Sequence, residues 1–206
     1  MIKFEQFDDF QFDVLREVGN IGAGNAATAL SKLISKEIDM KVPQVKIISF
    51  DEIADFVGGD ETIVVSVFLR VLGDISANMF FIISLASAKN LIRQLMGIDT
   101  GTEDSFDEME LSALNEIGNI LTGSYLSSLA DFTKLNMQPS VPAVAIDMAG
   151  AILSYGLLEI GNNGDFALTI DTAFLEGEQE VEGHFFLIPD PEALPQLFRA
   201  LGVPFE

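Results

Sequence analysis

Two short polar patterns contain the residue types in this chain that could do chemistry. In the first, Asp13, Glu17 and Asn20 are spaced so that on a helix they lie within about 60° of one another. A side-chain amide can accept a hydrogen bond from a water molecule and also donate one, and a carboxylate can pair with a cation. The three residues therefore form a candidate polar stripe on one face of a helix.

The same pattern occurs a second time. Ser112, Glu116 and Asn119 have the same spacing, and each Asn is followed by a proline after 22 intervening residues, Pro43 and Pro142. A single helical Glu or Asn usually belongs to a solvated face. Asn is a poor helix former, however, so its recurrence at an exposed position indicates a function that the fold itself does not require.

Both patterns belong to an internal repeat. Shifting the sequence by 99 positions aligns further identical pairs, among them Leu15 with Leu114, Gly19 with Gly118, Gly24 with Gly123 and Leu30 with Leu129. An internal repeat of this length decides the architecture. We expect one domain, residues 1–206, made of two copies at about 8–98 and 107–203 and related by pseudo-two-fold symmetry.

Each copy predicts the same order of elements. Apolar residues at helical spacing predict long helices, and runs rich in Val, Ile, Phe and Thr predict strands. The expected elements are a long helix (9–35; 107–133), a strand (45–50; 143–148), a shorter helix (51–57; 149–159), a hairpin (62–73 with 75–84; 165–175 with 179–189) and a helix ending at Gly97 or Gly202, the second with Pro191 near its start and Pro195 a turn later. The fold class is α+β: a six-stranded, largely antiparallel sheet with two long helices that carry the motifs.

Composition excludes several classes of function. The chain has 11 Lys and Arg against 32 Asp and Glu, a net charge of -21, so we expect no nucleic-acid partner. The acidity indicates solubility, with a docking face for a basic partner as the alternative. There is no Cys, no signal peptide is recognised and no apolar run is long enough to span a bilayer. We therefore expect no membrane insertion and a reducing, cytoplasmic location.

No other catalytic or metal-binding pattern stands out. The single His, His184, lies in a predicted strand, where a packing role is expected. The acidic stretches lack the Gly and the alternation of a calcium loop, so we expect no metal ligands in this chain. The stretch "GAGNAA" lacks the Gly-Lys-Ser/Thr of a phosphate loop and follows no strand.

The duplicated pattern (Asp or Ser)-x3-Glu-x2-Asn-x22-Pro resembles the signature of the CheC/CheX/FliY phosphatase family of bacterial and archaeal chemotaxis. The resemblance is closest to its CheC members, which have a similar length and also carry two copies. It covers about residues 8–203, and spacing, order and duplication all agree.

The resemblance implies an activity. Members of the family hydrolyse the phosphoaspartate of a CheY-like response regulator. Carried over to this sequence, the catalytic pairs are Glu17 with Asn20 and Glu116 with Asn119. Each Asn would orient the attacking water, and each Glu would anchor the active-site Lys of the regulator. No cofactor is expected on this chain, because the regulator would hold the Mg²⁺.

Supporting roles and a second partner follow from the same resemblance. Asp13 and Ser112 would set local geometry, and Pro43 and Pro142 would fix the loop that enters the strand. The receptor deamidase CheD is a candidate partner at residues about 149–159. This segment is markedly apolar, so a packed core helix is the alternative interpretation.

A non-catalytic role is the competing hypothesis. The fold also occurs in flagellar switch proteins, so the chain could be a module that binds CheY or regulates CheD. FliM-type switch proteins are expected to lack the paired Glu and Asn. FliY-type proteins are expected to carry a further domain and a regulator-binding peptide, which we do not expect in a chain that ends at Glu206.

The first long helix is also unusually rich in glycine. Gly19, Gly22 and Gly24 each weaken a helix relative to alanine. We expect them to leave room beside Asn20 for a neighbouring helix or a docked partner. Gly19 and Gly24, which have counterparts in the second copy, are the better candidates, whereas Gly22 and Asn25 indicate local packing.

Overall fold

The two halves of the chain fold into the same succession of elements. The computed structural model describes residues 9–97, 105–160, 166–176 and 179–202. The first half contains α1 (Asp9–Ile34), β1 (Asp39–Lys41), β2 (Val45–Ser49), η2 (Phe50–Glu52), α2 (Ile53–Phe56), β3 (Ile63–Gly73), β4 (Ala77–Ser84) and α3 (Leu85–Met96). The second half contains α4 (Glu108–Thr133), β5 (Met137–Pro139), β6 (Ala143–Met148), α5 (Ala149–Ile160), β7 (Phe166–Glu176), β8 (Gln179–Pro189) and α6 (Leu194–Ala200).

The strands form one antiparallel sheet that is six strand positions wide. Its path is β1-β7-β8-β4-β3-β5, with β2 also paired to β7 and β6 also paired to β3. Each outer position is therefore shared by two strands in succession. The expected six strands are present, and the described residues add β1 and β5, which extend the outer strands by three residues each.

The outer strands are exchanged between the two halves. β2 comes from the first half and pairs with β7 of the second, whereas β6 comes from the second half and pairs with β3 of the first. The centre of the sheet is the β4–β8 pair, one strand from each half. The two halves are therefore joined within a single sheet.

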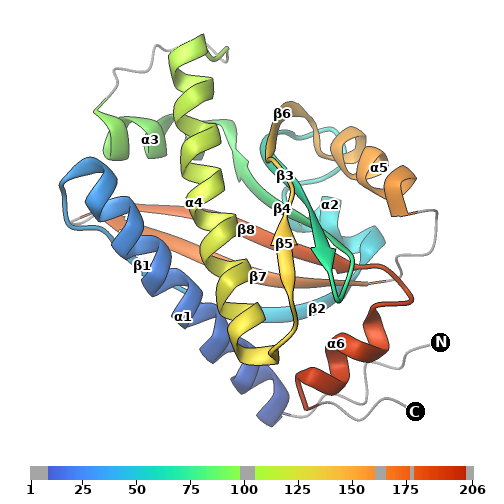
Figure 1. The fold of residues 1–206 in the computed structure, drawn as a ribbon. Helices are drawn as coiled ribbons and strands as arrows, with labels where there is room; N and C mark the ends of the chain where they lie inside the picture. Colours follow the sequence, from blue (N-terminus) through green and yellow to red (C-terminus); the bar gives the residue numbers. More distant parts are fainter. Residues whose placement is uncertain (1–8, 98–104, 161–165, 177–178, 203–206) are drawn as a thin grey trace.

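Helices cover both faces of this sheet. α1 and α4 lie side by side across one face together with α3 and α6, and the shorter α2 and α5 cover the other (Figure 1). Along β4, Phe81 and Ile83 pack into the larger core and Phe80 and Ile82 into the smaller one. This two-sided burial explains why the strand is a continuous apolar run.

The α1–α4 contact uses small residues on α1 and larger ones on α4. A Cβ atom on Gly22 would lie 2.9 Å from Tyr125 Cδ1 and 3.1 Å from Tyr125 Cα. Nearby, Asn25 Nδ2 donates a hydrogen bond to Ser128 Oγ at 3.3 Å. The predicted packing roles of Gly22 and Asn25 are confirmed.

Gly19 does not have the predicted role of opening space beside Asn20. It is buried against the sheet, where an added Cβ would lie 3.3 Å from Val42 Cγ1 and 3.4 Å from Ile170 Cγ2. The expectation failed because the glycine faces inward, one residue before the exposed Asn20. Only Gly24 of the three has no neighbour within 4 Å.

The helix ends agree with the sequence except at α6. Gly97 and Gly202 both have left-handed φ, 65° and 76°, as expected of glycines that end helices. Pro191, however, lies before α6 and not in it, because Ala193 N donates to Asp190 O in a turn that precedes the helix. Pro195 instead occupies the first turn, where a missing N–H costs nothing.

Tyr125 provides a prediction about ionisation. It is buried between α4 and the sheet, and its hydroxyl shares a 2.9 Å hydrogen bond with Thr172 Oγ1. Burial raises the pKa of Tyr125 to about 12, against the lesser effect of that hydrogen bond. The unfolded chain ionises this group near pH 10, so stability is lost as pH rises from about 10 to 12.

We therefore expect the absorbance of tyrosinate from Tyr125 to appear well above pH 10. Tyr155, the chain's other tyrosine, is assigned with the Tyr155→Phe variant, which leaves only Tyr125 to titrate. The remaining signal should rise near pH 12 or together with unfolding. A step near pH 10 in the folded Tyr155→Phe protein would contradict the buried, hydrogen-bonded position.

Candidate functional site

The paired Glu and Asn residues lie on the solvent-facing sides of α1 and α4. Glu17, Asn20, Glu116 and Asn119 are all exposed. The opposite faces of the helices are held against the sheet by buried apolar residues, Leu15 and Val18 on α1 and Leu114 and Ile117 on α4. The apolar faces fix the rotation of each helix, and the polar pairs consequently point outward, as predicted.

Within each pair the two side chains are neighbours. Residues three apart lie on the same helix face, one turn from each other. Helical side chains lean toward the N-terminus, so Asn20 leans toward Glu17, and Asn119 toward Glu116. No hydrogen bond or ion pair to another described residue occupies the carboxylate of Glu17 or of Glu116. Each pair thus presents a carboxylate and an amide that can engage a partner together.

The two pairs form separate surfaces. In Figure 1, α1 and α4 run in opposite directions, and they meet where Gly22 faces Tyr125. Both motifs lie on the N-terminal side of this crossing in their own helix. They therefore lie on opposite sides of the crossing and do not form one composite site.

The residues that open each motif are also exposed. Asp13 Oδ1 accepts a 2.7 Å hydrogen bond from Arg16 Nη2, with side chains 64% and 54% exposed. Such an exposed pair contributes little to stability. Ser112 is exposed at the corresponding position of α4. Their role in setting local geometry stays a prediction.

The two motif prolines lie at the breaks in the outer strands. Pro43 falls between β1 and β2, and Pro142 between β5 and β6. A proline has no N–H for the strand ladder, so it interrupts pairing at that point. It also restricts the residue before it to extended backbone.

The residue before the motif proline packs against the motif helix in the first copy but not in the second. Val42, just before Pro43, is 6% exposed and packs beside Gly19, the residue preceding Asn20. The corresponding Val141 is 88% exposed, and Gly118 packs against Val67 instead. Pro43 therefore has a path of contacts to its Asn, whereas Pro142 has a different environment.

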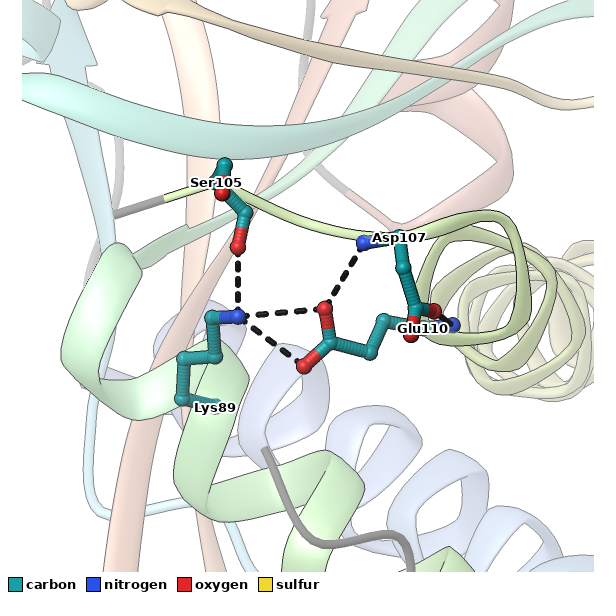
Figure 2. Close-up of polar contacts among 4 residues, drawn as sticks. All are labelled: Lys89, Ser105, Asp107 and Glu110. Carbon is teal, nitrogen blue, oxygen red and sulfur yellow. Dashed lines mark hydrogen bonds and ion pairs between the residues drawn. The ribbon is translucent and has the colours of Figure 1, made fainter. Parts of the chain in front are cut away.

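A buried ion pair fixes the beginning of α4, just ahead of the second motif. Lys89 of α3 donates to Glu110 Oε1 at 2.9 Å, to Oε2 at 3.1 Å and to Ser105 O at 2.5 Å (Figure 2). The Lys89 and Glu110 side chains are 12% and 5% exposed. The ammonium also lies 4.3 Å from the centre of the Phe106 ring.

The same glutamate caps the helix. Asp107 N donates to Glu110 Oε2, and Glu110 N donates to Asp107 Oδ1, both at 2.8 Å. This reciprocal arrangement is a capping box. Sequence reasoning missed it as part of the site's support. The Asp-x-x-Glu spacing was a usable signal for the cap, but nothing local marked Lys89 as its partner.

In the part of the chain that the structure describes, polar groups outside the motifs do not form a second catalytic set. His184 Nδ1 lies 2.9 Å from Asp171 Oδ1, and its ring meets Phe56 edge-on at 5.2 Å. These contacts suit the expected packing role. Among the described residues, no three His, Asp or Glu side chains lie together as metal ligands would. The helices in the described part of the chain include none with the length and hydrophobicity of a membrane span.

Comparison with known proteins places this geometry in a family. The model of the CheC-like family matches residues 10–47 and 109–146, the two motif segments. The Bacillus subtilis protein named CheY-P phosphatase CheC is 48% identical over 203 residues, covering 97% of each chain. The chain belongs to the CheC-like family.

Solved structures agree with the fold of this CheC-like protein. The crystal structure of Thermotoga maritima FliY superposes with a TM-score of 0.76 at 19% identity, covering 95% of this chain and 98% of that one. The FliM middle domain from H. pylori gives a TM-score of 0.69 at 12% identity, covering 94% and 99%. At these identities the likeness concerns the α+β fold alone.

Proposed function

We propose that this CheC-like protein is a phosphatase that hydrolyses the phosphoaspartate of a CheY-like chemotaxis response regulator. The observation that carries the proposal is the 48% identity, over 97% of both chains, to the protein named CheY-P phosphatase CheC. The exposed Glu and Asn pairs supply surfaces on which such a partner could dock.

The proposed reaction needs little covalent chemistry from this chain. An acyl phosphate is hydrolysed when water attacks phosphorus in line with the leaving carboxylate. The new bond joins the water oxygen to phosphorus. The bond from phosphorus to the aspartyl oxygen breaks, which releases phosphate and restores the carboxylate. No covalent intermediate on this chain is expected.

The amide of Asn20 or Asn119 would orient the water. Its oxygen accepts a hydrogen bond from the water and its NH₂ group donates to the phosphoryl oxygens, which holds the nucleophile in line. GTPases use a glutamine side chain in this way. Both amides are exposed, so they can enter the cleft of a docked regulator.

The neighbouring glutamates would anchor the partner. Glu17 or Glu116 would pair with a lysine beside the phosphoryl group, which orients the helix and contributes specificity. The Mg²⁺ that assists phosphoryl transfer would be held by the regulator.

The residues around each motif, a second partner and the cellular location also belong to this proposal. Asp13, Ser112, Pro43 and Pro142 would support the catalytic pairs. A CheD-type deamidase would dock on α5. There Ile152 and Leu153 are buried in the smaller core, so contact would use other residues of that helix. A cytoplasmic location suits a regulator partner.

Removing both amides tests the function. We expect Asn20→Ala/Asn119→Ala to lose about 100-fold in the rate of phosphate release from a phosphorylated CheY-like regulator, equivalent to about 2.7 kcal/mol of transition-state stabilisation. Each single variant should retain the activity of its remaining site. The measurement is the decay of labelled phosphate on the regulator.

Asn25→Ala is the matched control. It removes an amide from the same helix, but one that already donates a hydrogen bond to Ser128 Oγ of α4. Its activity should stay close to that of the parent. If the double variant hydrolyses the phosphoaspartate as fast as the parent, the catalytic assignment is wrong. If the parent itself has no activity, a non-catalytic binding module becomes the better account.

A further inference from the structure

Gly24 and Gly123 are the glycines in α1 and α4 that the fold does not explain. Each lies four residues after a motif asparagine, in the middle of a 26-residue helix. A Cβ atom added to either would have no neighbour within 4 Å. Gly19, Gly22 and Gly118, in contrast, all lie against other side chains.

Backbone conformation does not require glycine at these positions either. Neither residue is among the glycines with positive φ. Thr28 Oγ1 donates to Gly24 O at 2.9 Å across one helical turn, and Gly24 lies within an uninterrupted helix. Alanine would fit both places and would favour the helix. The two helices nevertheless share this less stable choice at corresponding positions.

A side chain at either glycine position would cover the motif asparagine that precedes it. A helical side chain leans over the turn on its N-terminal side, so any residue at 24 would lean toward Asn20, and any residue at 123 toward Asn119. Because glycine has no side chain, the amide of each asparagine stays uncovered on the side of the following helical turn. Beside it, Ile21 is 49% exposed and offers an apolar contact.

On α1 this open surface continues. Gly24 borders a shallow depression that reaches the β1 strand, lined also by Thr28, Ser31, Lys32 and Asp39. A partner that covers Asn20 can therefore lie close to the helix along the following turn.

We propose that Gly24 and Gly123 are positioning residues, where the regulator approaches the helix backbone closely enough for the preceding asparagine to reach the acyl phosphate. This inference rests on the proposed phosphatase function. The glycines take no part in the chemistry. They set the distance between the two proteins, and with it the position of the amide.

Substitutions at Gly24 and Gly123 should change thermal stability and phosphatase activity in opposite directions. We expect Gly24→Ala/Gly123→Ala to raise Tm by about 3–8 °C, because alanine favours an exposed helix at both positions. The same variant should lose about tenfold in kcat/KM toward the phosphorylated regulator, with kcat falling as well as KM rising, because the added methyl groups would hold the amides away from the acyl phosphate. Gly24→Gln/Gly123→Gln should lose more, because its longer side chains would cover the asparagines.

Asp131→Ala is the control for helix stabilisation. Asp131 is exposed near the C-terminal end of α4, twelve residues after Asn119. This variant should also raise Tm but leave kcat and KM unchanged. Steady-state kinetics and thermal unfolding are measured on all four proteins.

The outcomes distinguish this inference from the function it rests on. Parent-like kinetics in the Gln variant would overturn the role of the glycines and leave the phosphatase intact. A fall in Tm in the Ala variant would also overturn it, since the fold would then need glycine. Absence of phosphatase activity in the parent would instead refute the proposed function.

Discussion

Replacing Lys89 by methionine is expected to lower the free energy of unfolding by about 3–5 kcal/mol. The substitution leaves Glu110 as an almost fully buried carboxylate without its cation. It also removes the hydrogen bond to Ser105 O and the contact with the Phe106 ring. Breaking one side of a buried pair costs far more than the pair contributes, because the remaining charge stays desolvated. Denaturant unfolding monitored by circular dichroism provides the measurement.

Two further variants make this prediction specific. Lys89→Met/Glu110→Gln removes both charges, and glutamine can still accept the hydrogen bond from Asp107 N, so most of the lost stability should return. Arg16→Met breaks the exposed pair with Asp13 and should cost less than about 1 kcal/mol. If Lys89→Met were as mild as Arg16→Met, the ion pair would not be holding α4.

The Gly118→Ala substitution, which adds a single methyl group, is expected to lower the free energy of unfolding by about 3 kcal/mol. The added carbon would lie 2.7 Å from Val67 Cγ1 and closer still to Cγ2. Val67 is a buried, β-branched residue of β3 in a paired strand, so it cannot rotate away freely. α4 must therefore lift from the sheet, and Asn119, the next residue, must move with it. The change in unfolding midpoint measures the cost.

The internal repeat supplies the matched control for this methyl group. At the corresponding Gly19, an added Cβ meets Val42 Cγ1 at 3.3 Å, a contact that a small shift relieves. Gly19→Ala should therefore change the unfolding free energy by no more than about 1 kcal/mol, with the gain in helix propensity opposing the contact. Val67→Ala should restore part of the stability of Gly118→Ala in a double-mutant cycle. Equal effects at Gly19 and Gly118 would contradict the difference in packing.

Much of this architecture could be predicted from the sequence because the same pattern of residues occurs in both copies of the internal repeat. The long helices, the hairpins and the outward rotation of Glu17, Asn20, Glu116 and Asn119 all follow from periodicity and from the repeat. β1 and β5 were missed because three residues are too few for a pattern to show.

Contacts between distant segments could not be predicted. Nothing in the local sequence indicates that Lys89 meets Glu110, or that Gly19 faces Val42 and Gly22 faces Tyr125. A glycine weakens a helix in the same way whether it faces a sheet, a helix or solvent. Only the three-dimensional surroundings distinguish Gly19 from Gly24.

The exchanged outer strands have a consequence for how the molecule could be divided. A cut between α3 and α4 would leave the first half with an unpaired edge at β3 and would detach β2 from its partner strand, β7. The second half would be incomplete in the mirrored way. Unpaired edges of this kind attract other strands. Each half therefore resembles one subunit of a dimer, with the two subunits joined in a single chain. Neither half alone would provide a complete sheet beneath its motif helix.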